Sequence, residues 1–233
     1  MEKVSAIVPA YNESSRLARV LQVLTTYPNF SEVIVVNDGS TDDTKTQALK
    51  YRIRYLEHLR NKGKGLAMDT GVKHASGQII FFSDADIKGL SHEIITDILS
   101  PVLKEQADMS IGIRPRKIYR LPLSRYYSLL IGGERAMRKE IWECIPSYYK
   151  QGFRIEVAMN YAARHCGRGL HRQIVPNLKQ TIKEQKTGII PGLFSRKKMV
   201  QDVATSLWHL YILRKPIPGL TQKNLSPSPS NPH

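Results

Sequence analysis

The chain has 233 residues, of which 41% are hydrophobic and 24% charged, an ordinary balance for a folded domain with a full core. No apolar run approaches the roughly 18 residues that a membrane-spanning helix needs, and two cysteines are too few for a disulfide framework. The N-terminus enters a strand pattern without a signal peptide, which favours a cytoplasmic location.

The net charge of +15 is unevenly distributed along the chain. Residues 1–113 carry 13 Lys/Arg and 14 Asp/Glu, whereas residues 114–233 carry 22 Lys/Arg and 6 Asp/Glu. We therefore expect one domain with a near-neutral half, 1–113, and a basic half, 114–215. The basic half suggests an anionic partner, such as nucleic acid, an anionic membrane surface or a phosphorylated substrate. A basic but otherwise ordinary surface is the alternative.

The first half of the chain alternates apolar runs with amphipathic helices. Strands are expected at residues 4–9, 32–37, 52–56, 79–82 and 109–113, and the unbroken apolar run at 79–82 indicates a strand buried on both faces. Helical periodicity predicts helices between the first four strands, and again over 91–103. This order predicts an α/β fold with a mostly parallel, doubly wound sheet and helices on both faces.

The second half is less regular. Helices are expected over 123–131, 154–166 and 196–213, with an added strand at 170–175. Residues 216–233, rich in Pro and Ser, predict a disordered tail.

The last predicted helix has an unusual composition. It carries Trp208, His209 and Tyr211 after a basic run, Arg196-Lys197-Lys198. Aromatic residues beside a basic run suggest peripheral binding to an anionic membrane surface. Packing of Trp208 on the domain, with a solvated basic run, is the alternative.

Two carboxylates, Asp84 and Asp86, follow the strand at 79–82. Ligands of open α/β sheets gather at the carboxyl ends of the strands. Two neighbouring carboxylates repel each other unless a cation or a proton offsets their charge. The pair therefore indicates a site for a hard divalent metal, Mg²⁺ or Mn²⁺, or else a solvated turn.

Four strings in order carry a family resemblance: S-A-I-V-P-A-Y-N-E from Ser5, V-I-V-V-N-D-G-S-T-D-D-T from Val33, N-K-G-K-G from Asn61 and F-F-S-D-A-D from Phe81. Together they resemble the nucleotide-sugar half of the family 2 glycosyltransferases, which have the GT-A fold. The likeness continues more loosely through G-G-E-R-A-M-R-K, G-F-R-I-E-V-A-M-N-Y-A-A and K-E-Q-K-T-G, strings of a subgroup whose acceptor is generally uncertain.

The resemblance implies that the first half binds a UDP- or GDP-sugar. The turn with Pro9, Tyr11 and Glu13 should face the nucleotide, and Asp38 should accept a hydrogen bond from the base or ribose. A simple turn signal in Asp38-Gly39 is the alternative for that residue.

Positive charge for the phosphates is expected from three side chains. Lys62 and Lys64 lie on a glycine-flanked loop where a chain can approach a ligand, and Arg135 follows the later Gly-Gly break. Solvated side chains are the alternative for each of them. The loop is not a Walker phosphate loop, because the G-x-x-x-x-G-K-[ST] order is absent.

The catalytic residues implied by the resemblance are Asp86 and Glu156. A metal held by Asp84 and Asp86 would neutralise the leaving nucleoside diphosphate. Glu156 matches the general base that activates an acceptor hydroxyl in an inverting displacement. If the acceptor is a lipid-linked phosphate, no base is required. A glutamate favoured by the helix dipole at a helix start is the alternative for Glu156.

One position departs from the family pattern. Many relatives carry a histidine, the third metal ligand, a few residues before the K-E-x-K-x-G string, and Gln180 occupies that place here. His171 is nearby in sequence but out of register. The metal is therefore held by carboxylates and phosphates alone, or Gln180 or His171 replaces the histidine.

Two other functions are alternatives for this chain. A sugar nucleotidyltransferase needs a glycine-rich, Arg-containing loop after the first strand, where this chain has P-A-Y-N-E. A non-catalytic nucleic-acid binder needs an aromatic-studded sheet or a recognition helix, and neither signature is present. A glycosyltransferase is the favoured function, and we expect no nucleic-acid partner.

Overall fold

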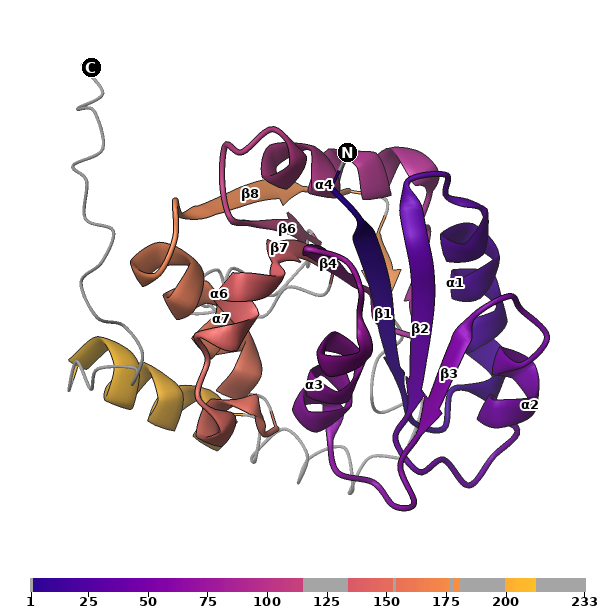
Figure 1. The fold of residues 1–233 in the computed structure, drawn as a ribbon. Helices are drawn as coiled ribbons and strands as arrows, with labels where there is room; N and C mark the ends of the chain where they lie inside the picture. The colour runs from indigo at the N-terminus through magenta and orange to yellow at the C-terminus, as the bar shows by residue number, and fades with distance from the viewer. Residues whose placement is uncertain (1, 115–133, 153, 177, 181–199, 213–233) are drawn as a thin grey trace.

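The structure is a computed structural model that describes residues 2–114, 134–152, 154–176, 178–180 and 200–212. Within these residues, seven strands form one sheet, and helices cover both of its faces (Figure 1). The strands are β1 (Val4–Ala10), β2 (Phe30–Asn37), β3 (Arg54–Glu57), β4 (Ile79–Phe82), β6 (Met109–Ile113), β7 (Arg135–Arg138) and β8 (Leu170–Ile174). They lie in the order β3-β2-β1-β4-β7-β6-β8.

Among the described strands of this sheet, β7 alone runs antiparallel to its neighbours, which are β4 and β6. A separate two-stranded ribbon pairs β5 (Ile87–Lys88) with β9 (Lys179–Gln180). The predicted mostly parallel, doubly wound sheet is confirmed.

The helices divide between the two faces of the sheet (Figure 1). They are α1 (Ser14–Thr26), α2 (Thr44–Ala48), α3 (Lys64–His74), α4 (His92–Leu103), α6 (Lys139–Glu143), the 3₁₀ turn η1 (Ser147–Lys150), α7 (Arg154–His165) and a helix over 200–207 that continues as the π-helical turn η2 (Trp208–Ile212). None of them combines the length and hydrophobicity needed to cross a membrane, within the ranges described.

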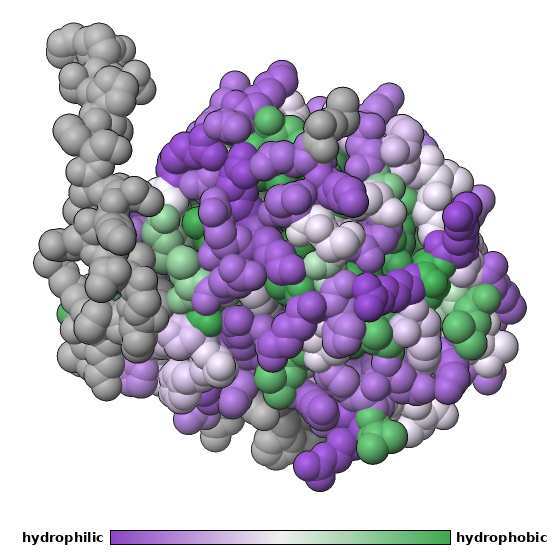
Figure 2. Space-filling model, viewed as in Figure 1, coloured by the Kyte–Doolittle hydropathy of each residue, from purple (hydrophilic) through white to green (hydrophobic). Residues whose placement is uncertain are grey.

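The strands fill two cores because their side chains alternate between the faces. Ile80 and Phe82 of β4 join a cluster with α3, α6 and α7. Ile79 and Phe81 join a second cluster with α1 and α4. An unbroken apolar run was therefore a correct indicator of a strand covered on both sides. The outer surface seen in Figure 2 is mostly hydrophilic, with smaller apolar areas between the polar ones.

The sequence patterns did not predict β7. Its four residues, R-A-M-R, follow the Gly-Gly break and carry two arginines, so no apolar run marks them as a buried strand. The predicted helix over 123–131 and the predicted tail over 216–233 lie outside the described residues. The predicted helix over 196–213 is described from residue 200 to residue 212.

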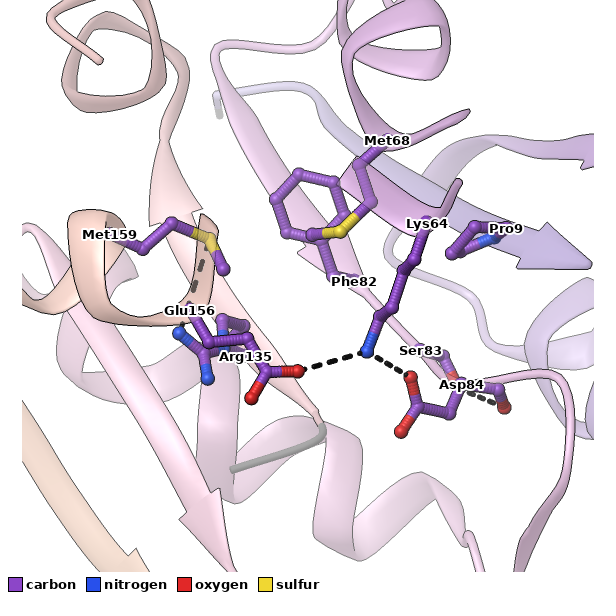
Figure 3. Close-up of a pocket in the computed structure, with 9 residues that line it drawn as sticks. All are labelled: Pro9, Lys64, Met68, Phe82, Ser83, Asp84, Arg135, Glu156 and Met159. Carbon is purple, nitrogen blue, oxygen red and sulfur yellow. Dashed lines mark hydrogen bonds and ion pairs between the residues drawn. The ribbon is translucent and has the colours of Figure 1, made fainter. Parts of the chain in front are cut away.

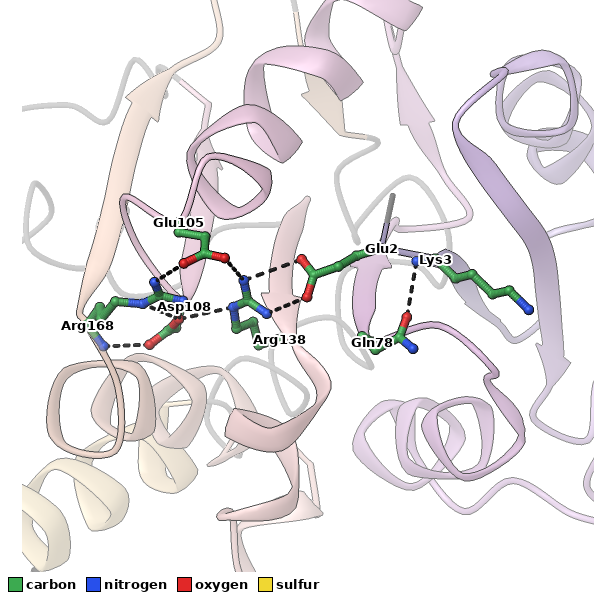
Figure 4. Close-up of polar contacts among 7 residues, drawn as sticks. All are labelled: Glu2, Lys3, Gln78, Glu105, Asp108, Arg138 and Arg168. Carbon is green, nitrogen blue, oxygen red and sulfur yellow. Dashed lines mark hydrogen bonds and ion pairs between the residues drawn. The ribbon is translucent and has the colours of Figure 1, made fainter. Parts of the chain in front are cut away.

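A cluster of ion pairs closes the amino-terminal edge of the sheet (Figure 4). Asp108, just before β6, lies 3.3 Å from Arg138 Nε and 3.1 Å from Arg168 Nη2. Arg138 also reaches Glu2 at 2.8 Å, which fixes the start of the chain to β7. Acids and bases form ion pairs here, at the edge opposite the carboxyl ends of β1 and β4, so we assign the cluster a structural role.

Helix α3 is held by Asp69, a buried acid on its inner side. The Asp69 carboxylate accepts hydrogen bonds from Trp142 Nε1 at 2.9 Å and Lys150 Nζ at 2.8 Å, and pairs with Lys73. At the start of the helix, a Cβ on Gly65 would overlap the backbone carbonyl of Lys150. These contacts fix the helix end that carries Lys64.

We expect Asp69→Asn to lower the free energy of unfolding at neutral pH by about 2 kcal/mol, since hydrogen bonds to charged groups are each worth about that much. Burial alone would raise the pKa of Asp69, but Lys150, Lys73 and Trp142 outweigh it and lower the pKa. A lowered folded-state pKa stabilises the protein above the unfolded value, about 3.9, and the stabilisation is lost as the pH falls through the folded value.

Urea unfolding at a series of pH values checks this prediction. The difference between wild type and Asp69→Asn should shrink as the pH is lowered below about 4. The exposed Asp97→Asn on α4 is the matched control and should unfold like wild type. A difference that stays constant down to the lowest pH would contradict the role given to the Asp69 charge.

Candidate active site

A small pocket opens where β1 and β4 end (Figure 3). Its walls are Pro9, Lys64, Met68, Phe82, Ser83, Asp84, Arg135, Glu156 and Met159. The space between these walls, open solvent included, is about 220 Å³.

Lys64 lies between two carboxylates that come from opposite halves of the chain (Figure 3). Its Nζ is 2.7 Å from Asp84 Oδ1 and 3.3 Å from Glu156 Oε1. Burial alone would lower the pKa of Lys64, but the two carboxylates outweigh it and hold the pKa well above its usual value. The ammonium is charged, and it joins the end of β4 to the first turn of α7.

Asp84 meets a second cation on its other oxygen. Arg114, directly after β6, places Nη2 3.1 Å from Asp84 Oδ2 and Nε 3.3 Å from a buried carboxylate, Glu134. Burial alone would raise the pKa of Asp84, but Lys64 and Arg114 hold it well below its ordinary range. Burial raises the pKa of Glu134 despite the neighbouring Arg114. Asp84 is thus an ionised carboxylate between two fixed positive charges.

Arg135 brings a further buried guanidinium into the pocket wall. It is the first residue of β7, and its Nη1 is 3.5 Å from Asn160 Oδ1 on α7. Burial lowers the pKa of Arg135, and the charges of Glu156 and Asp84 oppose that shift. A planar guanidinium in a low-dielectric wall suits recognition of a phosphate or carboxylate.

The two predicted metal ligands lie together at this edge of the sheet. Asp84 and Asp86 are both buried and follow β4 directly. No cluster of three or more His, Cys, Asp or Glu suited to a metal occurs among the described residues. Magnesium-type sites often use only one or two carboxylates and take their other oxygens from substrate phosphates and water. The donor set therefore fits a metal that arrives with a phosphorylated ligand.

The two candidates for a third metal ligand lie in different places. The backbone of Gln180 pairs with Ile87, the residue after Asp86, in the β5–β9 ribbon. His171 pairs with Ser110 near the start of β6 and is exposed, toward the opposite edge of the sheet. His171 is therefore too far toward the other edge of the sheet to be a metal ligand. Gln180 stays a candidate because its backbone lies beside Ile87, next to Asp86.

Asp38 has a role that the sequence did not reveal. Its buried carboxylate accepts hydrogen bonds from the backbone N–H groups of Lys62 at 2.9 Å and Gly63 at 2.7 Å, and lies 2.7 Å from His58 Nδ1. These bonds hold the loop that leads into α3. Asp38 thus positions Lys64, and its predicted contact with the base or ribose stays a prediction.

The remaining predicted residues are not part of the pocket wall. Tyr11 is exposed, and so is Lys62, whose backbone is bound to Asp38. Glu13 is buried at the start of α1 and lies 2.9 Å from Arg16 Nη1. Of the predicted residues, the pocket wall contains Pro9, Lys64, Asp84, Arg135 and Glu156.

Sequence reasoning missed Arg114 and Glu134. A usable signal exists for the first, since Arg114 follows the predicted strand at 109–113 much as Asp84 follows the strand at 79–82. Parallel strands bring such residues to one edge of the sheet. Glu134 precedes β7 and could be found only once that strand was recognised.

Comparison with known proteins gives a consistent result. The sequence model of the family described as "Glycosyl transferase family 2" matches residues 5–167. The dolichyl-phosphate beta-glucosyltransferase of Drosophila melanogaster is 42% identical over 132 residues, which cover 49% of this chain and 40% of that protein. The dodecaprenyl-phosphate galacturonate synthase of Rhizobium johnstonii is 31% identical over 125 residues, covering 49% and 37% respectively. The chain thus spans less than half the length of either relative.

Among solved structures, glucosyl-3-phosphoglycerate synthase from Mycobacterium tuberculosis, in complex with Mn²⁺, UDP and glucosyl-3-phosphoglycerate, has a TM-score of 0.74. The match covers 89% of this chain and 79% of that one at 19% identity. At this identity the likeness concerns the fold, and it agrees with the predicted GT-A architecture.

Proposed function

We propose that this chain, which belongs to glycosyl transferase family 2, transfers a sugar from a nucleoside diphosphate-sugar to an acceptor, with a divalent metal and with inversion at the anomeric carbon. The observation that carries the proposal is the set of buried charges at the strand ends. Asp84 is flanked by Lys64 and Arg114, and Arg135 and Glu156 complete the pocket. Such a set of charges suits a ligand that carries two phosphates and whose reacting carbon lies between those phosphates and an acceptor.

The donor half of the pocket binds the diphosphate. Asp84 and Asp86 would hold Mg²⁺ or Mn²⁺, which when bound supplies Lewis-acid neutralisation of the leaving diphosphate. Lys64 and Arg135, which line the same pocket, supply positive charge for the phosphates. Since Lys64 is bonded to Asp84 at 2.7 Å, we expect its ammonium to turn toward a phosphate oxygen when the donor binds.

The acceptor half presents Glu156. The Glu156 side chain comes from the first turn of α7, and among the described residues its buried Oε2 has no hydrogen-bond donor. That oxygen is available to take the proton of an acceptor hydroxyl during an in-line displacement. An acceptor that is already an ionised phosphate needs no such base.

The acceptor that we propose carries a phosphate and is held on a lipid. The basic half of the chain, with 22 Lys/Arg against 6 Asp/Glu in residues 114–233, favours an anionic acceptor. The names of the Drosophila and Rhizobium relatives both contain a polyprenyl-type phosphate, dolichyl or dodecaprenyl. A small phosphorylated acid, as in the mycobacterial complex, is the second candidate.

Thermal unfolding with nucleotides tests the donor part of the proposal. UDP or GDP should raise the melting temperature when Mn²⁺ is present and much less when it is absent. A ligand at 100 times its Kd adds about 2.7 kcal/mol to the free energy of unfolding, which is several degrees for a domain of this size. Equal stabilisation with and without metal would contradict the metal, and no stabilisation by either nucleotide would contradict the donor.

A further inference from the structure

The helix over residues 200–212 has apolar residues on its outer side as well as on its inner side. Val203 and Leu210 are buried against the domain. Val200, Trp208 and Ile212 are 46%, 53% and 60% exposed, and Ala204 between them is also exposed. Residues four apart lie on one side of a helix, so Val200, Ala204, Trp208 and Ile212 form one outward apolar stripe.

Arginines from other elements lie near this helix at two places. At the first place, Arg154 stacks over the exposed ring of Tyr148 at 4.6 Å and lies 3.4 Å from Asp202. At the second place, burial raises the pKa of the Tyr211 hydroxyl, and the positive charges of Arg164 and Arg172 partly offset that rise. The rings of Tyr161 and His165 on α7, which also carries Arg164, lie 5.1 and 6.5 Å from the Tyr211 ring. Arg164 and Arg172 are both exposed, so their charges face water.

We propose that this outward stripe docks on the surface of a membrane that contains anionic lipids. An amphipathic helix with Trp on its apolar side and Lys/Arg beside it lies in the membrane interface, with its apolar face buried at the headgroup–acyl boundary. Trp208 is placed for that boundary. Charge complementarity favours anionic lipid, because Arg164 and Arg172 are exposed, whereas Asp202 of this helix is buried and ion-paired with Arg154.

The docking surface lies next to the acceptor side of the pocket. Arg154 joins the first turn of the last helix, at Asp202, to the start of α7. Glu156 follows Arg154 by two residues and lines the pocket. A membrane against the stripe would therefore lie on a helix that is joined directly to the helix carrying Glu156. Any consequence for acceptor delivery rests on the proposed function, whereas the docking itself does not.

Vesicle sedimentation with the full chain tests the docking. We expect the wild-type chain to bind phosphatidylcholine vesicles that contain phosphatidylserine, to bind pure phosphatidylcholine weakly, and to lose binding as salt is raised. Trp208→Glu and Ile212→Glu should each weaken binding on the order of tenfold or more, since each removes the burial of a large apolar side chain. The control is Leu49→Glu after α2, where Leu49 is 56% exposed, and it should bind like wild type.

Tryptophan fluorescence provides a second readout. The chain has two tryptophans, and Trp142 is only 1% exposed. A blue shift on adding anionic vesicles should therefore come from Trp208, and it should be absent in Trp208→Glu. Since Trp208 is half exposed, this variant should keep the wild-type circular dichroism spectrum.

Three outcomes would overturn the docking proposal: no binding to anionic vesicles, equal binding by the stripe variants and wild type, or a dimer in solution that Trp208→Glu disperses. The last result would assign the stripe to a second copy of the chain. Nucleotide stabilisation is measured on the same samples without lipid. If the chain does not bind vesicles but is still stabilised by nucleotide, the docking proposal fails and the proposed function stands. If it binds vesicles but is not stabilised by nucleotide, the proposed function fails and the docking proposal stands.

Discussion

Asp86→Ala should reduce sugar transfer on the order of 1,000-fold while the domain stays folded. Asp86 is buried at the strand end beside Asp84. The substitution would remove one of the two carboxylates that we propose hold the metal at the diphosphate. A Lewis-acid metal contributes several kcal/mol to the transition state, and each 1.36 kcal/mol is a tenfold change in rate. Release of the nucleoside diphosphate from the donor, followed by mass spectrometry, measures the loss.

Two controls separate loss of metal from loss of fold. Asp97→Ala removes an exposed acid of α4 and should transfer at the wild-type rate. Asp86→Asn keeps the shape of the side chain but not its charge, so it should fold normally and still lose most activity. EDTA should inhibit the wild-type chain reversibly, with recovery on adding Mn²⁺. Full activity of the wild type in EDTA would refute the assignment of Asp86.

The donor half of the fold was predictable because its strands follow one simple rule. Strands covered on both faces need apolar residues at every position, and the runs at Val33–Val36 and Ile79–Phe82 meet that need. Once the strands are parallel, residues that follow them must meet at one edge. Asp84 and Asp86 are therefore expected at that edge, and both are buried just after the end of β4.

The basic half was less predictable because its buried positions are occupied by charges. β7 contains a wholly buried arginine, Arg135. A prediction based on hydrophobic pattern treats an arginine as evidence against a buried strand. What stabilises this arginine is the set of acids around it, Glu156 and Asp84 among them, and those acids come from other elements. No local sequence pattern shows that distant acids will offset the charge of a buried arginine. β7 and the neighbouring Glu134 could therefore be identified only from the three-dimensional structure.

The same difficulty affected individual roles. Asp38 was recognised as a site residue, but its bonds to the backbone of Lys62 and Gly63 depend on a loop more than twenty residues later in the chain. The helix over 200–212 has apolar residues on two sides, and Val203 is buried whereas Val200 is 46% exposed. Apolar spacing identifies an amphipathic helix but does not say which of two apolar sides faces the domain.

Glu156→Gln should distinguish between the two classes of acceptor. With a hydroxyl acceptor, transfer should fall about 100- to 10,000-fold, because a positioned general base contributes that much. With a phosphate acceptor, which is already ionised, we expect a loss of less than about tenfold on the same grounds. Glutamine keeps the size of the side chain and an oxygen that can accept from Lys64 Nζ, now 3.3 Å from Glu156 Oε1.

The comparison is made with one donor and both acceptors, a polyprenyl phosphate in vesicles and a soluble sugar alcohol. Glu143→Gln on α6, an exposed position, is the control and should behave like wild type with both. A large loss with the phosphate acceptor would mean that Glu156 acts by holding Lys64 in place, because that ion pair serves any acceptor. Undiminished transfer to the hydroxyl acceptor would remove the base role, and α7 would then contribute to catalysis only through the shape and charge of the pocket.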